Sequence, residues 1–133
     1  MQPTIPFTFT LFGATGDLSM RKILPALFVA HREGKLHQDG RIICVAKQDF
    51  SQEDYLAWVS KSAIPYVKSG VDETHWQGFL ARITYLSLDL LDRPGYQVLA
   101  DALAGSKAVS VFYLATSPSL FEPICAKIGR AHV

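Results

Sequence analysis

Cysteine is scarce in this sequence of 133 residues, which contains only Cys44 and Cys125. Two cysteines cannot build a disulfide scaffold and are typical of a reduced, cytoplasmic chain. Net charge is nearly absent as well, at +1, so the charge balance indicates neither nucleic acid nor an anionic membrane surface as a partner. No apolar run approaches the roughly 18 residues that span a membrane, and the first residues lack the basic and apolar regions of a secretory signal. We therefore expect a cytoplasmic protein that binds neither nucleic acid nor membrane.

The motifs of several enzyme classes are missing too. None of the four histidines pairs with a cysteine at the spacing of metal ligands, so we expect no metal site. No Gly-x-Ser-x-Gly segment is present, which removes the case for a serine hydrolase. A Walker-type phosphate loop needs four residues between its glycines and then Lys-Ser or Lys-Thr, whereas only two residues separate Gly13 from Gly16 and Asp17 follows. Cys44 and Cys125 both lie in apolar patterns that are typical of core residues rather than of nucleophiles.

What the sequence does contain is an alternation of strand and helix patterns. It predicts a Rossmann-like α/β fold, with an incomplete parallel sheet of about four strands and helices on both faces. A single domain over residues 1–133 is expected, and the abrupt end at 129–133 suggests a non-native or disordered tail. The expected strands are residues 7–12, 41–46, 82–88 and 108–115, and helical patterns begin at or near residues 18, 51, 72, 94 and 117. Pro25 inside the first helical pattern predicts either a kink or the start of the first regular turn.

The most informative segment follows the first expected strand directly and reads Gly-Ala-Thr-Gly-Asp-Leu, residues 13–18. In a dinucleotide-binding fold this turn brings backbone close to a diphosphate, which the start of the next helix then faces with free N–H groups. Gly13 and Gly16 fill the last two positions of Gly-x-Gly-x-x-Gly, but Leu11 stands at the first, so a turn without a ligand is the alternative. For Asp17 the alternative to a ligand contact is a helix N-cap. The candidate coenzyme-binding residues here are Gly13, Ala14, Thr15, Gly16, Asp17 and Leu18.

The end of the second expected strand should discriminate between the two nicotinamide coenzymes. Enzymes that use NAD usually carry Asp or Glu there, for the ribose 2′-hydroxyl, whereas this chain has Lys47 and then Gln48. A cation suits the 2′-phosphate of NADP, so Lys47 and Gln48 are candidate coenzyme residues, with a solvated surface lysine as the alternative. Lys47 lies further from the glycines than the usual ~20 residues, and the long connection at residues 34–40 accounts for that.

Two further places could contact a bound coenzyme. Lys22 falls near the start of the first helix and could face a phosphate, although its spacing alone favours a plain surface charge. Ala115 and Thr116 follow the fourth expected strand, which should adjoin the first strand where the crossover reverses. Small residues there would let the backbone pass close to a nicotinamide. The alternative is a simple turn, with an N-cap supplied by the Ser-Pro pair that follows.

Residues 12–27 as a whole resemble the N-terminal signature of glucose-6-phosphate dehydrogenase, Gly-x-x-Gly-Asp-Leu-Ala/Ser-x-x-Lys-x-x-Pro-x-Leu. This pattern is far more specific than the two glycines alone. Residues 112–121 are similar to the family's Tyr-Leu-Ala-x-Pro-Pro-x-x-Phe, and the likeness covers residues 7–128. The positions beyond the glycines that match the signature are Asp17, Leu18, Lys22, Pro25 and Leu27.

The resemblance implies oxidation of glucose 6-phosphate to 6-phosphogluconolactone in the pentose phosphate pathway, with hydride transfer to NADP. It implies that residues 13–18 line the coenzyme phosphates and that Ala115 and Thr116 lie along its inner end. Lys22 corresponds to a lysine near the reacting sugar and the nicotinamide, which makes it the candidate catalytic residue. Where the family has Gly-x-Ala-Arg, this chain has Cys-Val-Ala-Lys, so Lys47 keeps the charge but loses the planar fork of an arginine.

Family members are several times longer, and the segments with the catalytic histidine–aspartate pair would follow this chain. We therefore expect an NADP-binding domain that is inactive alone. The alternative is a non-catalytic Rossmann module that acts in oligomerisation or in dinucleotide binding only, because an exposed edge on the fourth strand would favour a homo-oligomer. An unrelated short-chain dehydrogenase ranks lower, because Tyr113 is followed four residues later by Ser117 rather than by lysine.

Overall fold

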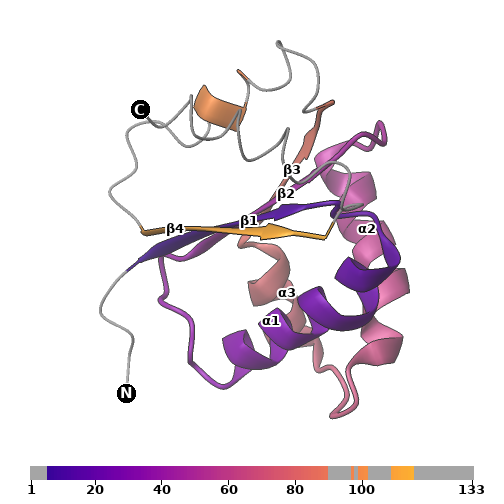
Figure 1. Ribbon diagram of the computed structural model, residues 1–133. Coiled ribbons are helices and arrows are strands. Elements are labelled where there is room, and N and C mark those ends of the chain that lie inside the picture. The colour runs from indigo at the N-terminus through magenta and orange to yellow at the C-terminus, as the bar shows by residue number, and fades with distance from the viewer. Residues whose placement is uncertain (1–5, 90–96, 98, 102–108, 116–133) are drawn as a thin grey trace.

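The computed structural model describes residues 6–89, 97, 99–101 and 109–115 (Figure 1). Strands and helices alternate along these residues, as the sequence predicts. The elements are β1 (Phe7–Phe12), η1 (Ser19–Ile23), α1 (Leu24–Arg32), β2 (Arg41–Ala46), α2 (Gln52–Ala63), η2 (Ile64–Tyr66), α3 (Glu73–Leu80), β3 (Ile83–Ser87) and β4 (Val109–Leu114).

The four strands form one parallel sheet in the order β3-β2-β1-β4. The fourth strand therefore lies beside the first, as predicted for the crossover point of a doubly wound sheet. Phe12 at the end of β1 is level with Val45 of β2 on one side and with Leu114 of β4 on the other. Because parallel strands end at the same edge, the segments that follow β1, β2 and β4 are brought together there.

Helices cover both faces of the sheet, which confirms the predicted Rossmann-like architecture. In Figure 1 the helices α1, α2 and α3 lie on one face, where Leu11, Cys44 and Phe28 belong to the larger buried cluster. On the opposite face, Phe12 and Leu99 belong to a second buried cluster, and residues 97 and 99–101 are helical. Residues 42–46 of β2 are all buried, as expected of a strand covered on both faces.

Pro25 marks the start of the regular helix, which is the second of the two alternatives. The residues Ser19–Ile23 form a π-helical turn, in which the N–H of Leu24 donates to the carbonyl of Ser19. The α-helix then begins at Leu24 with Pro25 in its first turn, where the missing N–H of proline costs nothing.

The helix ends follow the local signals of the sequence. Ser51 caps α2, because its hydroxyl accepts from the N–H of Asp54 at 3.1 Å, and Asp72 caps α3 by accepting from the N–H of His75 at 3.1 Å. After α1, Gly34 adopts φ +72° and its N–H donates to the carbonyl of His31, a common way for a helix to end at glycine.

Some predicted features lie outside the described residues. These are most of the helix expected at 94–103, the helix from residue 117, the tail at 129–133 and the candidate Thr116. Within the part of the chain that the structure describes, no helix is long and apolar enough to span a membrane.

Candidate functional site

The turn after β1 is anchored to the neighbouring strand. Gly13 has φ +78°, a conformation that side chains rarely adopt, so glycine is favoured at this point. The N–H groups of Gly13 and Ala14 both donate to the carbonyl of Val45 in β2, at 3.0 and 3.1 Å. The chain therefore leaves the sheet at a fixed position, directly beside the end of β2.

Gly16 closes the same turn and has little room for a side chain on the side of Gly13. Its N–H donates to the carbonyl of Gly13 at 2.9 Å, and a Cβ at Gly16 would lie only 3.2 Å from that oxygen. The buried hydroxyl of Ser19 donates to the same carbonyl at 2.9 Å. Helical structure begins at Asp17, directly after the turn. The first N–H groups of a helix have no acceptor within the helix, so they lie beside this turn.

Asp17 is turned away from the turn. Its carboxylate pairs with Arg21 one helical turn later, at 3.3 Å, and the Asp17 side chain is 79% exposed. Among the described residues it caps no backbone N–H, so the N-cap alternative is wrong. An acid in this position therefore leaves the turn open to an anionic group.

Thr15 and Gln48 join the turn to the segment that follows β2. The Thr15 hydroxyl donates to the side-chain oxygen of Gln48 at 2.7 Å, although 33 residues separate the two. Ala115 comes to the turn from the other side, because its N–H donates to the carbonyl of Phe12 at 3.0 Å. The structure thus brings three of the sequence-predicted segments to one edge of the sheet.

Lys47 stands at that edge as an exposed cation. Its side chain is 75% exposed, and its ammonium group lies 3.7 Å from a carboxylate oxygen of Asp89, which follows β3. Sequence reasoning missed Asp89. A signal was available, because Asp89 comes two residues after the end of a strand that neighbours β2 in the parallel sheet.

Two tyrosines contact the turn and the Gln48 segment from the buried side, and nothing in the sequence indicated either contact. The hydroxyl of Tyr55, in α2, donates to the carbonyl of Ala14 at 2.8 Å. The hydroxyl of Tyr85, in β3, donates to the carbonyl of Gln48 at 2.5 Å. Burial raises the pKa of both tyrosines, so both hydroxyls stay protonated and able to donate.

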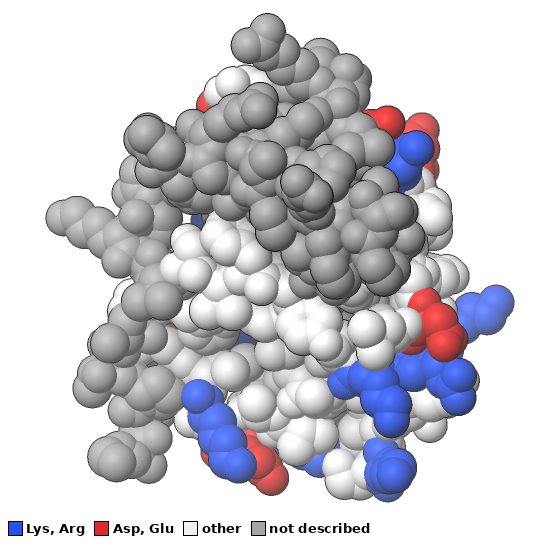
Figure 2. All heavy atoms as spheres, in the orientation of Figure 1, with Lys and Arg blue, Asp and Glu red and all other residues white. Residues whose placement is uncertain are grey.

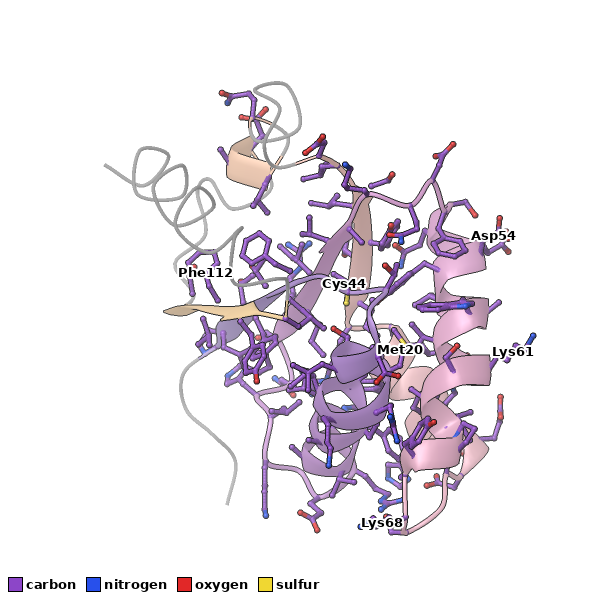
Figure 3. All side chains as sticks on the ribbon, turned by 45° about the vertical axis from the view of Figure 1, so that its right-hand side comes forward. Met20, Cys44, Asp54, Lys61, Lys68 and Phe112 are labelled. Atoms are coloured by element: carbon purple, nitrogen blue, oxygen red, sulfur yellow. The ribbon has the colours of Figure 1, made fainter. Side chains whose placement is uncertain are left out.

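Two hollows flank the start of the first helix. The first, of about 310 Å³, is lined by residues of the turn together with Met20 and Trp58, and Figure 3 shows Met20 beside α2. The second, of about 330 Å³, is lined by Lys22 and Lys68 among others. Lys22 is exposed and lines only the second hollow, so the structure does not bring it to the glycine turn. Figure 2 shows Lys and Arg side chains gathered over the helical part of this surface.

Among the described residues, Cys44 is not available as a nucleophile and no cluster of metal ligands is present. Burial raises the pKa of the Cys44 thiol to about 12, which keeps it protonated and inert, and Figure 3 shows Cys44 in the interior between sheet and helices. No group of three His, Cys, Asp or Glu side chains within the described ranges could hold a metal ion.

These observations define a class of protein. In this parallel sheet the first strand is followed by a Gly-x-x-Gly turn and the start of a helix, at the point where the strand order reverses. This arrangement is that of a Rossmann-like dinucleotide-binding domain. The family model described as "Glucose-6-phosphate dehydrogenase, NAD binding domain" matches residues 10–133. The chain therefore belongs to the glucose-6-phosphate dehydrogenase family, and the resemblance of residues 12–27 is confirmed.

Individual relatives agree. The chain is 37% identical to glucose-6-phosphate 1-dehydrogenase of Mycolicibacterium smegmatis, over 96% of this chain and 27% of the relative. It is 35% identical to that of Rhizobium meliloti, over 95% of this chain and 26% of the relative. The crystal structure of the Mycobacterium avium enzyme matches with a TM-score of 0.86 and 30% identity, over 96% and 27% of the two chains. A glucose-6-phosphate dehydrogenase solved with its substrate glucose-6-phosphate matches with a TM-score of 0.83 and 30% identity, over 100% and 29%. The chain spans about a quarter of the length of these relatives.

Proposed function

We propose that this chain is the coenzyme-binding part of an enzyme that oxidises glucose 6-phosphate to 6-phosphogluconolactone, with NADP as the hydride acceptor. The observation that carries the proposal is the meeting of the glycine turn, the Lys47–Gln48 segment and Ala115 at one edge of the sheet. A side chain at Gly16 would press on the carbonyl of Gly13, so glycine there keeps the turn compact beside the place proposed for the diphosphate. Residues 13–18 would line the diphosphate, and the donors would be N–H groups at the helix start, because those of Gly13, Ala14 and Gly16 already donate to protein carbonyls.

Lys47 supports NADP rather than NAD. Its ammonium group would exchange the half-buried carboxylate of Asp89 for the more highly charged 2′-phosphate of NADP. A charge-assisted contact is worth about 1.5–3 kcal/mol, and the lower end applies here because Lys47 is mostly exposed. That corresponds to about a tenfold preference for NADP. Gln48, held by Thr15, would fix the direction in which this segment leaves β2.

Lys22 is proposed as the residue of this chain near the reacting sugar. The proposal is supported by the match of Asp17, Leu18, Lys22 and Pro25 to the family signature, not by contact with the glycine turn. Lys22 would act as a fixed positive charge beside the sugar and the nicotinamide. Glucose 6-phosphate as substrate, Thr116 as a coenzyme contact and a cytoplasmic location belong to the same proposal.

A coenzyme titration of the chain tests the first part. We expect saturable binding of NADP by calorimetry and about tenfold weaker binding of NAD. Lys47→Ala should weaken NADP to the level of NAD and leave NAD unchanged. Lys61→Ala is the matched control, because Lys61 lies on the exposed side of α2 and points away from the body of the molecule in Figure 3. Absence of NADP binding at millimolar coenzyme would refute the proposal.

Oligomerisation without catalysis is the second candidate function, and β4 is the observation that favours it. Among the described strands β4 is an edge strand, and it exposes 43% of Val111 and 39% of Tyr113. Unpaired strand edges with apolar side chains favour pairing with another chain. Sedimentation of the chain at micromolar concentration separates the two functions, since a clean monomer that binds NADP supports the coenzyme domain alone.

A further inference from the structure

Tyr55 and Tyr85 come from different elements and form a stacked pair beneath the proposed coenzyme site. Their ring centroids are 4.3 Å apart, and the ring planes differ by 16°. The two residues are 0% and 7% exposed. Aromatic side chains with two torsion angles that are locked by such packing hold their terminal groups at a fixed position.

Each hydroxyl of the pair contacts a different segment of the site, one the turn after β1 and the other the segment after β2. Tyr55 donates to the carbonyl of Ala14, inside the glycine turn, at 2.8 Å. Tyr85 donates to the carbonyl of Gln48 at 2.5 Å and lies 3.4 Å from the carbonyl of Ala46. The two rings therefore bridge the turn after β1 and the segment after β2.

The bridge is closed on its outer side by a third hydrogen bond, from Thr15 to the Gln48 side chain at 2.7 Å. The turn and the segment are thus joined at two places, one buried and one exposed. A carbonyl that loses its buried donor is left unsatisfied, which costs more than the hydrogen bond itself contributes. The backbone of the turn or of the segment would shift to find a new partner if its tyrosine hydroxyl were removed.

We propose that Tyr55 and Tyr85 are positioning residues that divide coenzyme recognition between them, an inference that rests on the proposed function. Tyr55 fixes the turn that meets the diphosphate, a group that NAD and NADP share. Tyr85 fixes the segment that begins with Lys47, whose proposed partner is the 2′-phosphate that only NADP carries. Tyr55 therefore sets affinity for both coenzymes, and Tyr85 sets the preference for NADP.

Variants that keep the rings and remove only the hydroxyls test this division. Tyr55→Phe should raise the Kd of NADP and of NAD alike, by about tenfold, and leave their ratio unchanged. Tyr85→Phe should raise the Kd of NADP by about three- to tenfold and change that of NAD less than about twofold. Tyr113→Phe is the matched control, because Tyr113 is 39% exposed on β4 and stacks only on Phe9 among the described rings. Its two Kd values should equal those of the unchanged chain.

All titrations are performed below the melting temperature of every variant, so that a general loss of stability is measured separately. A loss of stability alone would lower neither affinity at that temperature, and it would not change the NADP-to-NAD ratio in one variant only. If the unchanged chain binds NADP while both tyrosine variants bind as it does, or both shift the ratio equally, the inference is wrong and the proposed function stands. If the unchanged chain binds no NADP, the proposed function fails and the inference with it.

Discussion

Replacement of Arg82 by methionine should lower the free energy of unfolding far more than an ordinary surface substitution does. The guanidinium of Arg82 donates to the carbonyls of His37 and Gly40 at 2.7 and 2.8 Å, and to Nδ1 of His31 at 2.8 Å. These acceptors belong to α1 and to the connection that leads from α1 to β2. Methionine keeps most of the aliphatic stem and leaves the three acceptors without this donor.

The magnitude follows from those three bonds. A hydrogen bond from a charged donor is worth about 1.5–3 kcal/mol, but Arg82 is only half-buried, so water can replace part of each. We take about 1 kcal/mol per bond, or about 3 kcal/mol in total, out of the 5–15 kcal/mol typical of a domain. For a chain of this length that corresponds to a melting temperature about 10–15 °C lower.

Urea unfolding followed by circular dichroism measures the loss. Arg41→Met is the matched control, because Arg41 is exposed at the start of β2 and has no side-chain hydrogen bond or ion pair among the described residues. The control should change the free energy of unfolding by less than about 0.5 kcal/mol. A loss below about 1 kcal/mol for Arg82→Met would refute the reasoning, since the connection would then hold its shape without the guanidinium.

Three other predictions follow from the described contacts. Burial, and then Arg82, lower the pKa of His31 from 6.5, so on acidification the unfolded chain binds a proton before the folded chain does, and stability should fall as the pH drops below about 6.5. Melting temperatures measured between pH 5.5 and 7.5 should therefore depend less on pH in His31→Gln than in the unchanged chain. An equal slope in the two chains would contradict this prediction. Cys44, with a pKa of about 12, should resist iodoacetamide at pH 8 in the native chain and react in urea, as peptide mass spectrometry can show; native labelling would mean that the core opens. Gly40→Ala should lower the free energy of unfolding by about 1–3 kcal/mol in the same urea assay, because the added Cβ would overlap the ring of Phe7. An unchanged urea midpoint would show that the ring moves aside freely.

The features that the sequence predicted well depend on residues close together in the chain. Ser51 and Asp72 cap their helices through N–H groups three residues later, and Gly34 ends α1 through a carbonyl three residues earlier. The spacing alone contains both partners of each bond. The strand limits were predictable because apolar alternation is a local pattern. The parallel order was predictable because a strand, a helix and a following strand almost always connect as a right-handed crossover between parallel strands.

The contacts that shape the candidate site join residues too far apart for such reasoning. Tyr55 and Ala14 are 41 residues apart, and Tyr85 and Gln48 are 37 apart. In the sequence Tyr55 is recognisable as part of an apolar helix face, but nothing shows which carbonyl its hydroxyl will reach. The π-helical turn before Pro25 could not be predicted either. Proline removes one regular hydrogen bond of an α-helix, but the sequence does not show which other hydrogen-bond pattern takes its place.

The distance between the glycine turn and Lys47 shows how the fold absorbs an unusual spacing. Counted along the chain, Lys47 lies beyond the usual ~20 residues from the glycines. Counted across the sheet, Phe12 is level with Val45, so Lys47 and Ala14 each lie two residues beyond this pair. The extra residues lie in the connection from α1 to β2, whose carbonyls Arg82 holds. The strand register, rather than the residue count, therefore determines where the cation stands. It follows that Arg82→Met should disturb the NADP preference only as far as it disturbs the pairing of β1 with β2.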